Sequence, residues 1–436
     1  MEEKKLDLNS IIGFVLIVGI LIWIMYQNQP DEKQVAAEKA KKELVQKQQA
    51  EIQKVKTAIA AVAKDTTAAD STQLSALKAT LGNFAYSATL PSAKESFTTI
   101  ENELVKITIA NKGGFITEAT LKNQERFKKG SQQLVSLIKD NNSDFNISLL
   151  TQDNRTLQTK DLFFEPTVTK VGDNQIVSMR LKAGANEYLE YKYVLKPNDY
   201  MIDFDVRSQG LNKVLNTSKP LDLEWKLKGI RNEKGIAYEN RYSEIYFEYE
   251  DKKIDYVGQG QNKEENANKV SFVAYKQHFF STILLTKTPF QNAKLHSDNL
   301  VVDEKKDTLF TKQFKANMPL AFNNGEVDYK MNWYIGPTDY ATLKSYDRDI
   351  NKIISLGWGI FGWINMFIFI PLFGFLSSYI AYGIAIIIFT IIIKIAMSPI
   401  TYKSFLSQAK MKVLRPEITE LGEKFKKDPM KKQQET

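Results

Sequence analysis

The sequence predicts a membrane protein of mixed class. We expect an extracytoplasmic antiparallel β-sandwich flanked by transmembrane α-helices, followed by a basic cytoplasmic helical segment. Three patterns support this: residues 11–26 and 357–400 are almost entirely apolar, apolar and polar side chains alternate through much of 95–336, and residues 401–436 are basic. They are the patterns of membrane spans, half-buried strands and a cytoplasmic flank, respectively.

Composition narrows the class of protein further. The chain has 436 residues, a net charge of +8 and 43% hydrophobic residues, which are ordinary globular values. A channel that fills the whole chain, a collagen-like fibre and a wholly disordered chain are therefore excluded. There is no cysteine, which excludes disulfides, thiolate metal sites and cysteine nucleophiles.

The first apolar segment is expected to be a transmembrane signal anchor over residues 11–26. The preceding residues 1–10 carry Lys4 and Lys5 and should be cytoplasmic, while Trp23 and Tyr26 suit the outer interface. A cleaved secretory signal is the alternative, but no small-x-small cleavage site follows the segment. The polar residues 27–94 then read as a helical and flexible tether.

Residues 95–350 are expected to form the β-sandwich domain, because their apolar side chains recur every second residue. Gly113 and Gly114 should form a turn between two strands, and residues 197–199 should join a hairpin over 191–206. Many strands separated by turn residues favour an antiparallel sandwich.

A search of this domain for catalytic or metal-binding residues finds little. His278 and His296 are the only histidines, and no acidic residues surround them at ligand spacing. The motifs of serine hydrolases, nucleotide-binding loops and zinc proteases are missing, so we expect neither an enzyme nor a cofactor, metal or small-molecule substrate. The aromatic residues of 242–249 could stack on a sugar but are more typical of sheet packing. The mixed charges give no support for DNA binding.

The second apolar block contains two segments, and their charge flanks favour a two-crossing topology. A basic carboxyl end and the amino terminus should both be cytoplasmic, so the chain should cross the membrane an even number of times. Residues 357–378, with Asn365 and Pro371, suit an interfacial amphipathic helix. Residues 379–400, with a single charge, should be the transmembrane helix.

Lys394 is that single charge. A lysine inside hydrocarbon costs roughly 2.5–3.5 kcal/mol on insertion scales, so it needs an explanation. Its ammonium could snorkel to the inner headgroups, or it could face a wet cavity in the inner leaflet. The sequence by itself favours neither the snorkelling lysine nor the lysine that faces a wet cavity.

Residues 401–436 are expected to form a basic amphipathic helix on the cytoplasmic side of the membrane. They contain nine Lys/Arg and five Asp/Glu. A basic amphipathic helix suits anionic lipid headgroups or ribosomal RNA, although ordinary positive-inside flanking charge explains the first lysines equally well. The basic positions assigned to this surface are Lys403, Lys410, Lys412, Arg415, Lys426 and Lys427.

Several stretches resemble the YidC membrane protein insertase family, of the Gram-negative type with a large extracytoplasmic domain. They are LGWGIFGWIN, IPLF, YGIAIIIFTIIIKIAMSPIT and KSFLSQAKMKVLRPEITELGEKFKKDPMKKQQE, with ELVKITIANKGGFITEATLKN and FVAYKQHFFSTIL in the sandwich. Nearly the whole chain is covered. The resemblance implies a sandwich of the super-sandwich type and a multi-pass protein of the bacterial inner membrane with its large domain in the periplasm.

The resemblance also implies a function and a site. The protein would insert and help fold inner-membrane proteins through a hydrophilic inner-leaflet groove, alone or with the Sec translocon. Its partners would be nascent membrane proteins, with the ribosome and anionic lipids at the basic hairpin. Lys394 stands where the family commonly has a groove arginine. In the family the residues matching 401–436 form a cytoplasmic helical hairpin. The family continues through further helices, so this basic cytoplasmic hairpin helix is expected to be incomplete and the chain to be truncated at its carboxyl end.

A different class of function stays open at this point. The chain could be a membrane-tethered binding module whose sandwich recognises carbohydrate or envelope partners. Lys394 and the basic hairpin favour the insertase, because a tether needs neither.

Overall fold

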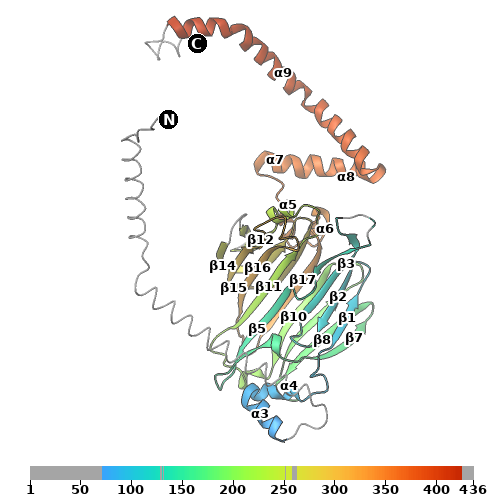
Figure 1. Ribbon diagram of the computed structural model, residues 1–436, viewed down its shortest axis with the longest axis vertical. Helices are drawn as coiled ribbons and strands as arrows, with labels where there is room; N and C mark the ends of the chain where they lie inside the picture. Colours follow the sequence, from blue (N-terminus) through green and yellow to red (C-terminus); the bar gives the residue numbers. More distant parts are fainter. Residues whose placement is uncertain (1–70, 128–129, 131, 251, 258–262, 425–436) are drawn as a thin grey trace, which may run out of the picture. The chain divides into compact units, whose positions relative to one another are not determined.

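The computed structural model describes residues 71–127, 130, 132–250, 252–257 and 263–424 (Figure 1). The chain divides into two compact units, with the boundary between Ile353 and Ile354. The expected segments 1–10, 11–26 and most of 27–94 lie outside the described residues, as do Lys426 and Lys427.

A small antiparallel sheet opens the first unit. Its four strands follow one another in space as they do along the chain, and a turn at Gly113 and Gly114 joins the second to the third. Both glycines have positive φ, which explains why glycine occupies this turn. The strands are β1 (Phe97–Glu101), β2 (Val105–Ala110), β3 (Ile116–Glu125) and β4 (Leu134–Ile138).

The large sheet of the first unit has 13 strands, all paired antiparallel. Its main path runs β6-β5-β11-β16-β15-β17-β10-β9-β8-β7, while β14 pairs with β15 and β12, and β12 with β13. The strands are β5 (Ser143–Leu150), β6 (Thr156–Gln158), β7 (Glu165–Val171), β8 (Asn174–Lys182), β9 (Tyr188–Leu195), β10 (Met201–Gln209), β11 (Leu221–Ile230), β12 (Glu244–Tyr249), β13 (Lys253–Val257), β14 (Lys263–Lys276), β15 (Phe280–Asn299), β16 (Phe310–Leu320) and β17 (Asp328–Pro337).

The large sheet folds onto itself, and the long strand β15 makes this possible. Its first part pairs with β17 over 280–286, and its last part pairs with β16 over 294–299. Pro289 lies between the two pairings and has no N–H to donate to a ladder. The Phe145 ring of β5 consequently contacts the Tyr191 ring of β9 and the Phe204 ring of β10, strands distant in the sheet order.

These contacts confirm the predicted sandwich. Along β11, Leu221, Leu223, Trp225 and Leu227 are buried, and the polar residues between them point outward. The predicted hairpin over 191–206 is confirmed by the register of β9 and β10, in which Tyr193 faces Phe204. The rings of Tyr193 and Phe204 stack at a centroid distance of 4.8 Å, so cross-strand packing favours this register of β9 and β10.

The predicted flexible tether is wrong over its last part. Residues 71–88 form α3 (Ser71–Leu81), the 3-10 turn η1 (Gly82–Phe84) and α4 (Ala85–Ala88). Leu77, Leu81 and Phe84 are buried, and the Arg155 guanidinium donates to the Ala79 carbonyl. The three apolar side chains fall on one helix face, and their burial offsets the weak helix propensity of the small polar residues around them.

Short helices follow the last strand. The stretch after Pro337 contains α6 (Tyr340–Ser345), capped by the Asp339 carboxylate, and the 3-10 turn η4 (Ile350–Ile353). Between β11 and β12 lies α5 (Ile236–Arg241), and two further 3-10 turns are η2 (Thr159–Asp161) and η3 (Leu211–Lys213).

From Gly359 to Lys424, the described part of the second unit consists of helices with a short break at 380–381. It contains α7 (Gly359–Ile364), the π-helical turn η5 (Asn365–Phe369), α8 (Ile370–Tyr379) and α9 (Tyr382–Lys424). The helix α9 runs without a break from the segment expected to span the membrane, 379–400, into the expected hairpin helix from 401, through Pro399 and Pro416. A proline inside a helix removes one hydrogen bond and strains one turn, which the flanking turns can tolerate.

A buried carboxylate on β9 gives a first testable prediction. The Glu190 side chain is 1% exposed and accepts hydrogen bonds from Arg180 Nε (2.8 Å), Ser178 Oγ (2.5 Å) and Arg207 Nε. Burial raises its pKa, but these donors more than offset burial and hold the pKa below the ordinary value. We expect Glu190→Gln to lower the free energy of unfolding by about 2 kcal/mol at pH 7.

The sign of the pH dependence follows from the lowered pKa. The stabilisation is present above the pKa of an unfolded glutamate, about 4.3, and is lost as pH falls through the lower folded pKa. Denaturant unfolding at neutral and acidic pH should show the Glu190→Gln penalty shrinking in acid. The exposed Asp173→Asn is the control, and an equal Glu190→Gln penalty at both pH values would contradict the prediction.

Candidate functional site

The helix α9 places Lys394 within its apolar first half. Ile391, Ile392 and Ile395 surround it, and all four side chains are exposed in this chain. The helices 359–379 and 382–424 are both long and apolar enough to cross a membrane, by length and composition only. The interfacial placement of 357–378 and the single crossing by 379–400 therefore stay predictions.

Lys394 belongs to a line of polar side chains that the sequence analysis missed. On a helix of 3.6 residues per turn, Thr390, Ser398 and Thr401 all lie within about 40° of Lys394. All three are exposed. We call Thr390, Lys394, Ser398 and Thr401 the polar stripe. The spacing i, i+4, i+8 and i+11 of these four residues is visible in the sequence. It places them on one face only if the helix continues unbroken through Pro399.

The hydroxyl groups of the stripe are partly satisfied by the helix itself. Thr390 Oγ1 donates to the Ile386 carbonyl at 2.7 Å, and Thr401 Oγ1 donates to the Met397 carbonyl at 2.9 Å. Each oxygen keeps lone pairs that can accept a hydrogen bond from a ligand or from water. Within the described part of the chain, no acidic side chain pairs with Lys394.

The opposite face of α9 is covered by η5 and α8. Ala385 is fully buried, and the Phe389 ring meets Phe369 and Phe373 at centroid distances of 5.5 Å and 5.9 Å. Ala385 lies about 180° around the helix from Lys394. The α8–α9 packing therefore leaves the polar stripe open to a ligand.

The basic residues beyond the stripe divide between two faces of α9. Lys412 and Arg415 continue the Lys394 face, whereas Lys403 and Lys410 lie roughly opposite it. All four are exposed. The predicted basic surface is therefore present on α9 as exposed side chains, but only two of its described members are in line with Lys394.

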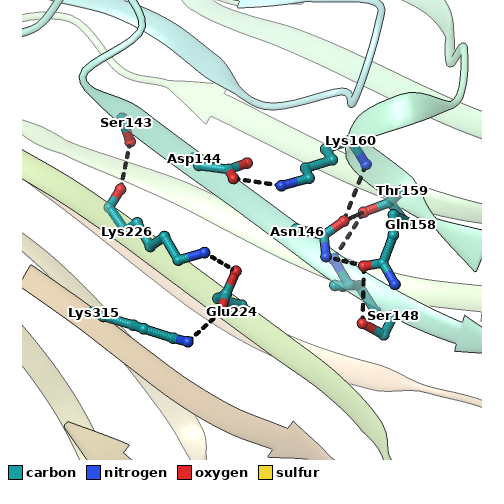
Figure 2. Close-up of polar contacts among 11 residues, drawn as sticks. Ser143, Asp144, Asn146, Ser148, Gln158, Thr159, Lys160, Glu224, Lys226 and Lys315 are labelled. Atoms are coloured by element: carbon teal, nitrogen blue, oxygen red, sulfur yellow. Dashed lines mark hydrogen bonds and ion pairs between the residues drawn. The ribbon is translucent and has the colours of Figure 1, made fainter. Parts of the chain in front are cut away.

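A second polar cluster lies on the outer face of β5, β11 and β16 (Figure 2). Figure 2 shows the Lys160 ammonium directed at the Asp144 carboxylate (2.7 Å), and Lys226 and Lys315 directed at the Glu224 carboxylate (2.5 Å and 2.8 Å). Burial raises the pKa of Glu224, but the two ammonium groups more than offset it, and the pKa lies below its ordinary value.

This cluster is better explained by sheet stability than by a ligand. Each of its two carboxylates is paired with lysine within the cluster, and the residues labelled in Figure 2 include no aromatic ring on which a sugar could stack. The aromatic side chains of residues 242–249 pack within the domain: Phe247 is buried and the Tyr246 ring stacks on Tyr256. Neither observation favours a carbohydrate module.

The two histidines form hydrogen bonds with acidic side chains. His278 Nδ1 is 2.6 Å from the Glu233 carboxylate, and His296 Nε2 is 2.8 Å from the Asp298 carboxylate. A search of the described residues finds no group of three or more histidine, cysteine or acidic side chains that could hold a metal ion.

Comparison with known proteins covers both units. Residues 98–371 match the family model described as the YidC periplasmic domain, and residues 372–436 match the one described as the 60Kd inner membrane protein. The membrane protein insertase YidC of Parabacteroides distasonis is 35% identical over 96% of this chain and 67% of that protein. The one from Bacteroides fragilis is 34% identical over 99% of this chain and 68% of that protein. The chain thus spans about two thirds of the length of these relatives.

A structural comparison finds a more distant likeness. The crystal structure of the periplasmic domain of the Thermotoga maritima YidC is 13% identical, with a TM-score of 0.31. The match covers 58% of this chain and 90% of that one.

Proposed function

Because the chain belongs to the YidC family of membrane protein insertases, we propose that it inserts and helps fold inner-membrane proteins along the polar stripe of α9. The observation that carries the site is the alignment of Thr390, Ser398 and Thr401 with Lys394 on one open helix face. Polar groups at this depth of an apolar segment are costly, and they are retained where they contact polar groups of a substrate or water.

The stripe can lower the cost of moving a polar segment of a client, the nascent membrane protein, through hydrocarbon. An acidic side chain or a backbone carbonyl that leaves water loses hydrogen bonds, at a cost of several kcal/mol when none replaces them. The Lys394 ammonium can attract and donate to such groups, and the hydroxyls of the stripe can accept from client N–H groups. Insertion then needs no covalent step and no cofactor.

The depth of Lys394 suits an inner-leaflet groove. It lies six residues before Ile400, which is about 9 Å along a helix. If the chain crosses the membrane at 379–400, with both ends cytoplasmic and residues 27–378 outside, the stripe opens toward the cytoplasm. Clients made on cytoplasmic ribosomes would enter from that side. Because α8 packs on the opposite face of α9, the client can use the stripe without displacing α8.

Besides its clients, the protein is expected to have three further partners: the ribosome, anionic lipids and the Sec translocon. The basic residues Lys403, Lys410, Lys412 and Arg415 suit the ribosome and anionic lipid headgroups, since both present phosphates. The Sec translocon would deliver clients that need both machines. The protein would be a multi-pass protein of the bacterial inner membrane, with the β-sandwich in the periplasm.

Apolar replacement of the stripe tests this proposal. We expect Thr390→Leu combined with Ser398→Leu to reduce client insertion about tenfold, because two hydrogen-bonding positions are lost while helix propensity is kept. The measurement is protease protection of a client in cells depleted of their own insertase. The matched control replaces two serines of α8, Ser377→Leu and Ser378→Leu, whose hydroxyls bond only to their own helix. Equal insertion by both double variants would exclude the stripe as the client surface.

A further inference from the structure

One end of the β-sandwich carries exposed apolar side chains beside arginines. Phe127, Tyr238, Phe279 and Leu309 are 46%, 53%, 55% and 57% exposed. Together with Arg126 and Arg231 we call them the α5 patch, because Tyr238 lies on α5. Figure 1 shows α5 and α6 at this end of the sandwich, and α3 and α4 at the other.

Direct contacts make the α5 patch one continuous surface. The Arg231 guanidinium lies 5.3 Å from the centre of the Phe127 ring, and the Arg231 N–H donates to the Leu309 carbonyl at 2.9 Å. On the other side, the His278 ring contacts Phe279 at 4.0 Å and Tyr238 at 5.2 Å between ring centres. The two halves meet at residues 231–233, because Glu233 accepts a hydrogen bond from His278.

The charges around the patch are mainly positive. Lys234 and Arg241 are exposed, and Arg126 and Arg231 are half-buried. The acidic side chains facing them are Glu233, held by His278, and Glu239, which is buried and accepts hydrogen bonds from the Asn232 and Glu233 N–H groups. Burial raises the pKa of Glu239 to about 7, so it contributes less than a full negative charge near neutral pH.

The connection from the last strand of the sandwich to the apolar helices starts next to this patch. The Thr338 N–H donates to the Phe279 carbonyl at 2.7 Å, directly after the last strand β17. From there the chain passes through α6 and η4 to the apolar helices that begin at Gly359. The patch is therefore at the end of the domain from which the membrane segments follow, which fits a lipid surface better than a distant protein partner.

We propose that the α5 patch docks the β-sandwich onto the surface of a bilayer that contains anionic lipids. Phenylalanine and tyrosine side chains enter the headgroup region readily, and arginines above it are attracted to lipid phosphates. The proposal rests on the membrane crossing by residues 379–400 given under Proposed function, and it is independent of insertion activity.

The test uses the absence of cysteine from the chain. A fluorophore is attached to Ala237→Cys, beside Tyr238, in the full chain reconstituted into nanodiscs of phosphatidylcholine with about one third phosphatidylglycerol. Headgroup-labelled nitroxide lipids then report contact by quenching. The control label is Ala185→Cys in the turn between β8 and β9, about 25 Å along the strand from the α6 end of the domain.

Docking predicts a specific set of results. Quenching at residue 237 should exceed that at residue 185 by about twofold, and should fall at about 1 M salt, where the screening length is only about 3 Å. Tyr238→Ser with Phe279→Ser should reduce it to the level of the control label. The matched double variant Val168→Ser with Val171→Ser, exposed on the edge strand β7, should leave it unchanged.

Two outcomes would overturn the docking proposal. Quenching at 237 no greater than at 185 would mean that this end does not touch lipid, and a protein partner would then be the better reading. Quenching that persists in the Tyr238→Ser and Phe279→Ser variant would mean that the linker alone holds the domain near the bilayer. Co-elution of the chain with the nanodiscs checks the membrane location separately, so its failure is recognised as such.

Discussion

Replacing Lys394 with glutamate is expected to abolish the insertion of clients that carry acidic segments. The change removes an attraction and adds a repulsion at the same point of the stripe. Two unit charges 4 Å apart interact by about 4 kcal/mol at an effective dielectric constant of 20. Because each 1.4 kcal/mol is a factor of ten, the loss should exceed a hundredfold.

Two other substitutions of Lys394 should reduce client insertion less than glutamate does. Lys394→Ala removes only the attraction, so we expect about a tenfold loss of insertion, and Lys394→Arg keeps the charge and should preserve it. Protease protection of an acidic-tailed client measures all three variants in cells depleted of their own insertase. Membrane abundance of each variant, measured in parallel, separates a loss of function from a loss of folding.

Moving the charge distinguishes a client-binding lysine from a snorkelling one. In Lys394→Ser with Ser398→Lys, the ammonium is one turn, about 6 Å, nearer the cytoplasmic end. A lysine that merely reaches for headgroups would be better placed there, and insertion would be unchanged. A client-binding lysine would lose its position, so we expect reduced insertion. Full activity of the moved charge, or of Lys394→Glu, would show that Lys394 is only an interfacial lysine.

The largest effect on stability is expected at the centre of the β-sandwich. Trp225 is 1% exposed, stacks on Tyr275 at a centroid distance of 3.7 Å, and meets Trp333 edge-on at 4.8 Å. Trp225→Ala removes the largest side chain of this cluster and leaves a cavity between the two layers. Such a change costs about 3–5 kcal/mol.

The measurement is thermal unfolding of the sandwich in the intact chain. A loss of this size should lower the midpoint by roughly 10 °C for a domain of this length. Phe97→Ala is the matched control, because Phe97 is 66% exposed on β1 and its removal should change the midpoint little. A Trp225→Ala shift as small as that of Phe97→Ala would mean that the layers do not pack around Trp225.

Local patterns in the sequence were sufficient for the fold class and for the hairpins. The alternation in 191–195 and 201–206 and the turn between them predict β9 and β10 and their pairing, because both strands are adjacent in the chain. Gly113 and Gly114 predict the β2–β3 turn for the same reason. The resemblance to the YidC family also came from contiguous stretches of sequence and is confirmed by the comparisons.

Distant pairings were decided by the tertiary structure alone. No local signal tells that β5 pairs with β11 or that β10 pairs with β17, more than a hundred residues later. These partners are chosen because they bring Phe145, Phe204 and Trp225 into one core, and that choice depends on the whole domain. The same holds for α3, whose apolar side chains looked like parts of a tether until the domain covered them.

The candidate site divides in the same way. The sequence alone singled out Lys394, because a charge within an apolar segment is costly wherever the segment packs. Which polar residues share its face depends on whether α9 continues through Pro399, and proline usually predicts a break. That Lys394 points away from α8 depends on Ala385 and Phe389 packing against that helix, a contact between separate helices that no local pattern determines.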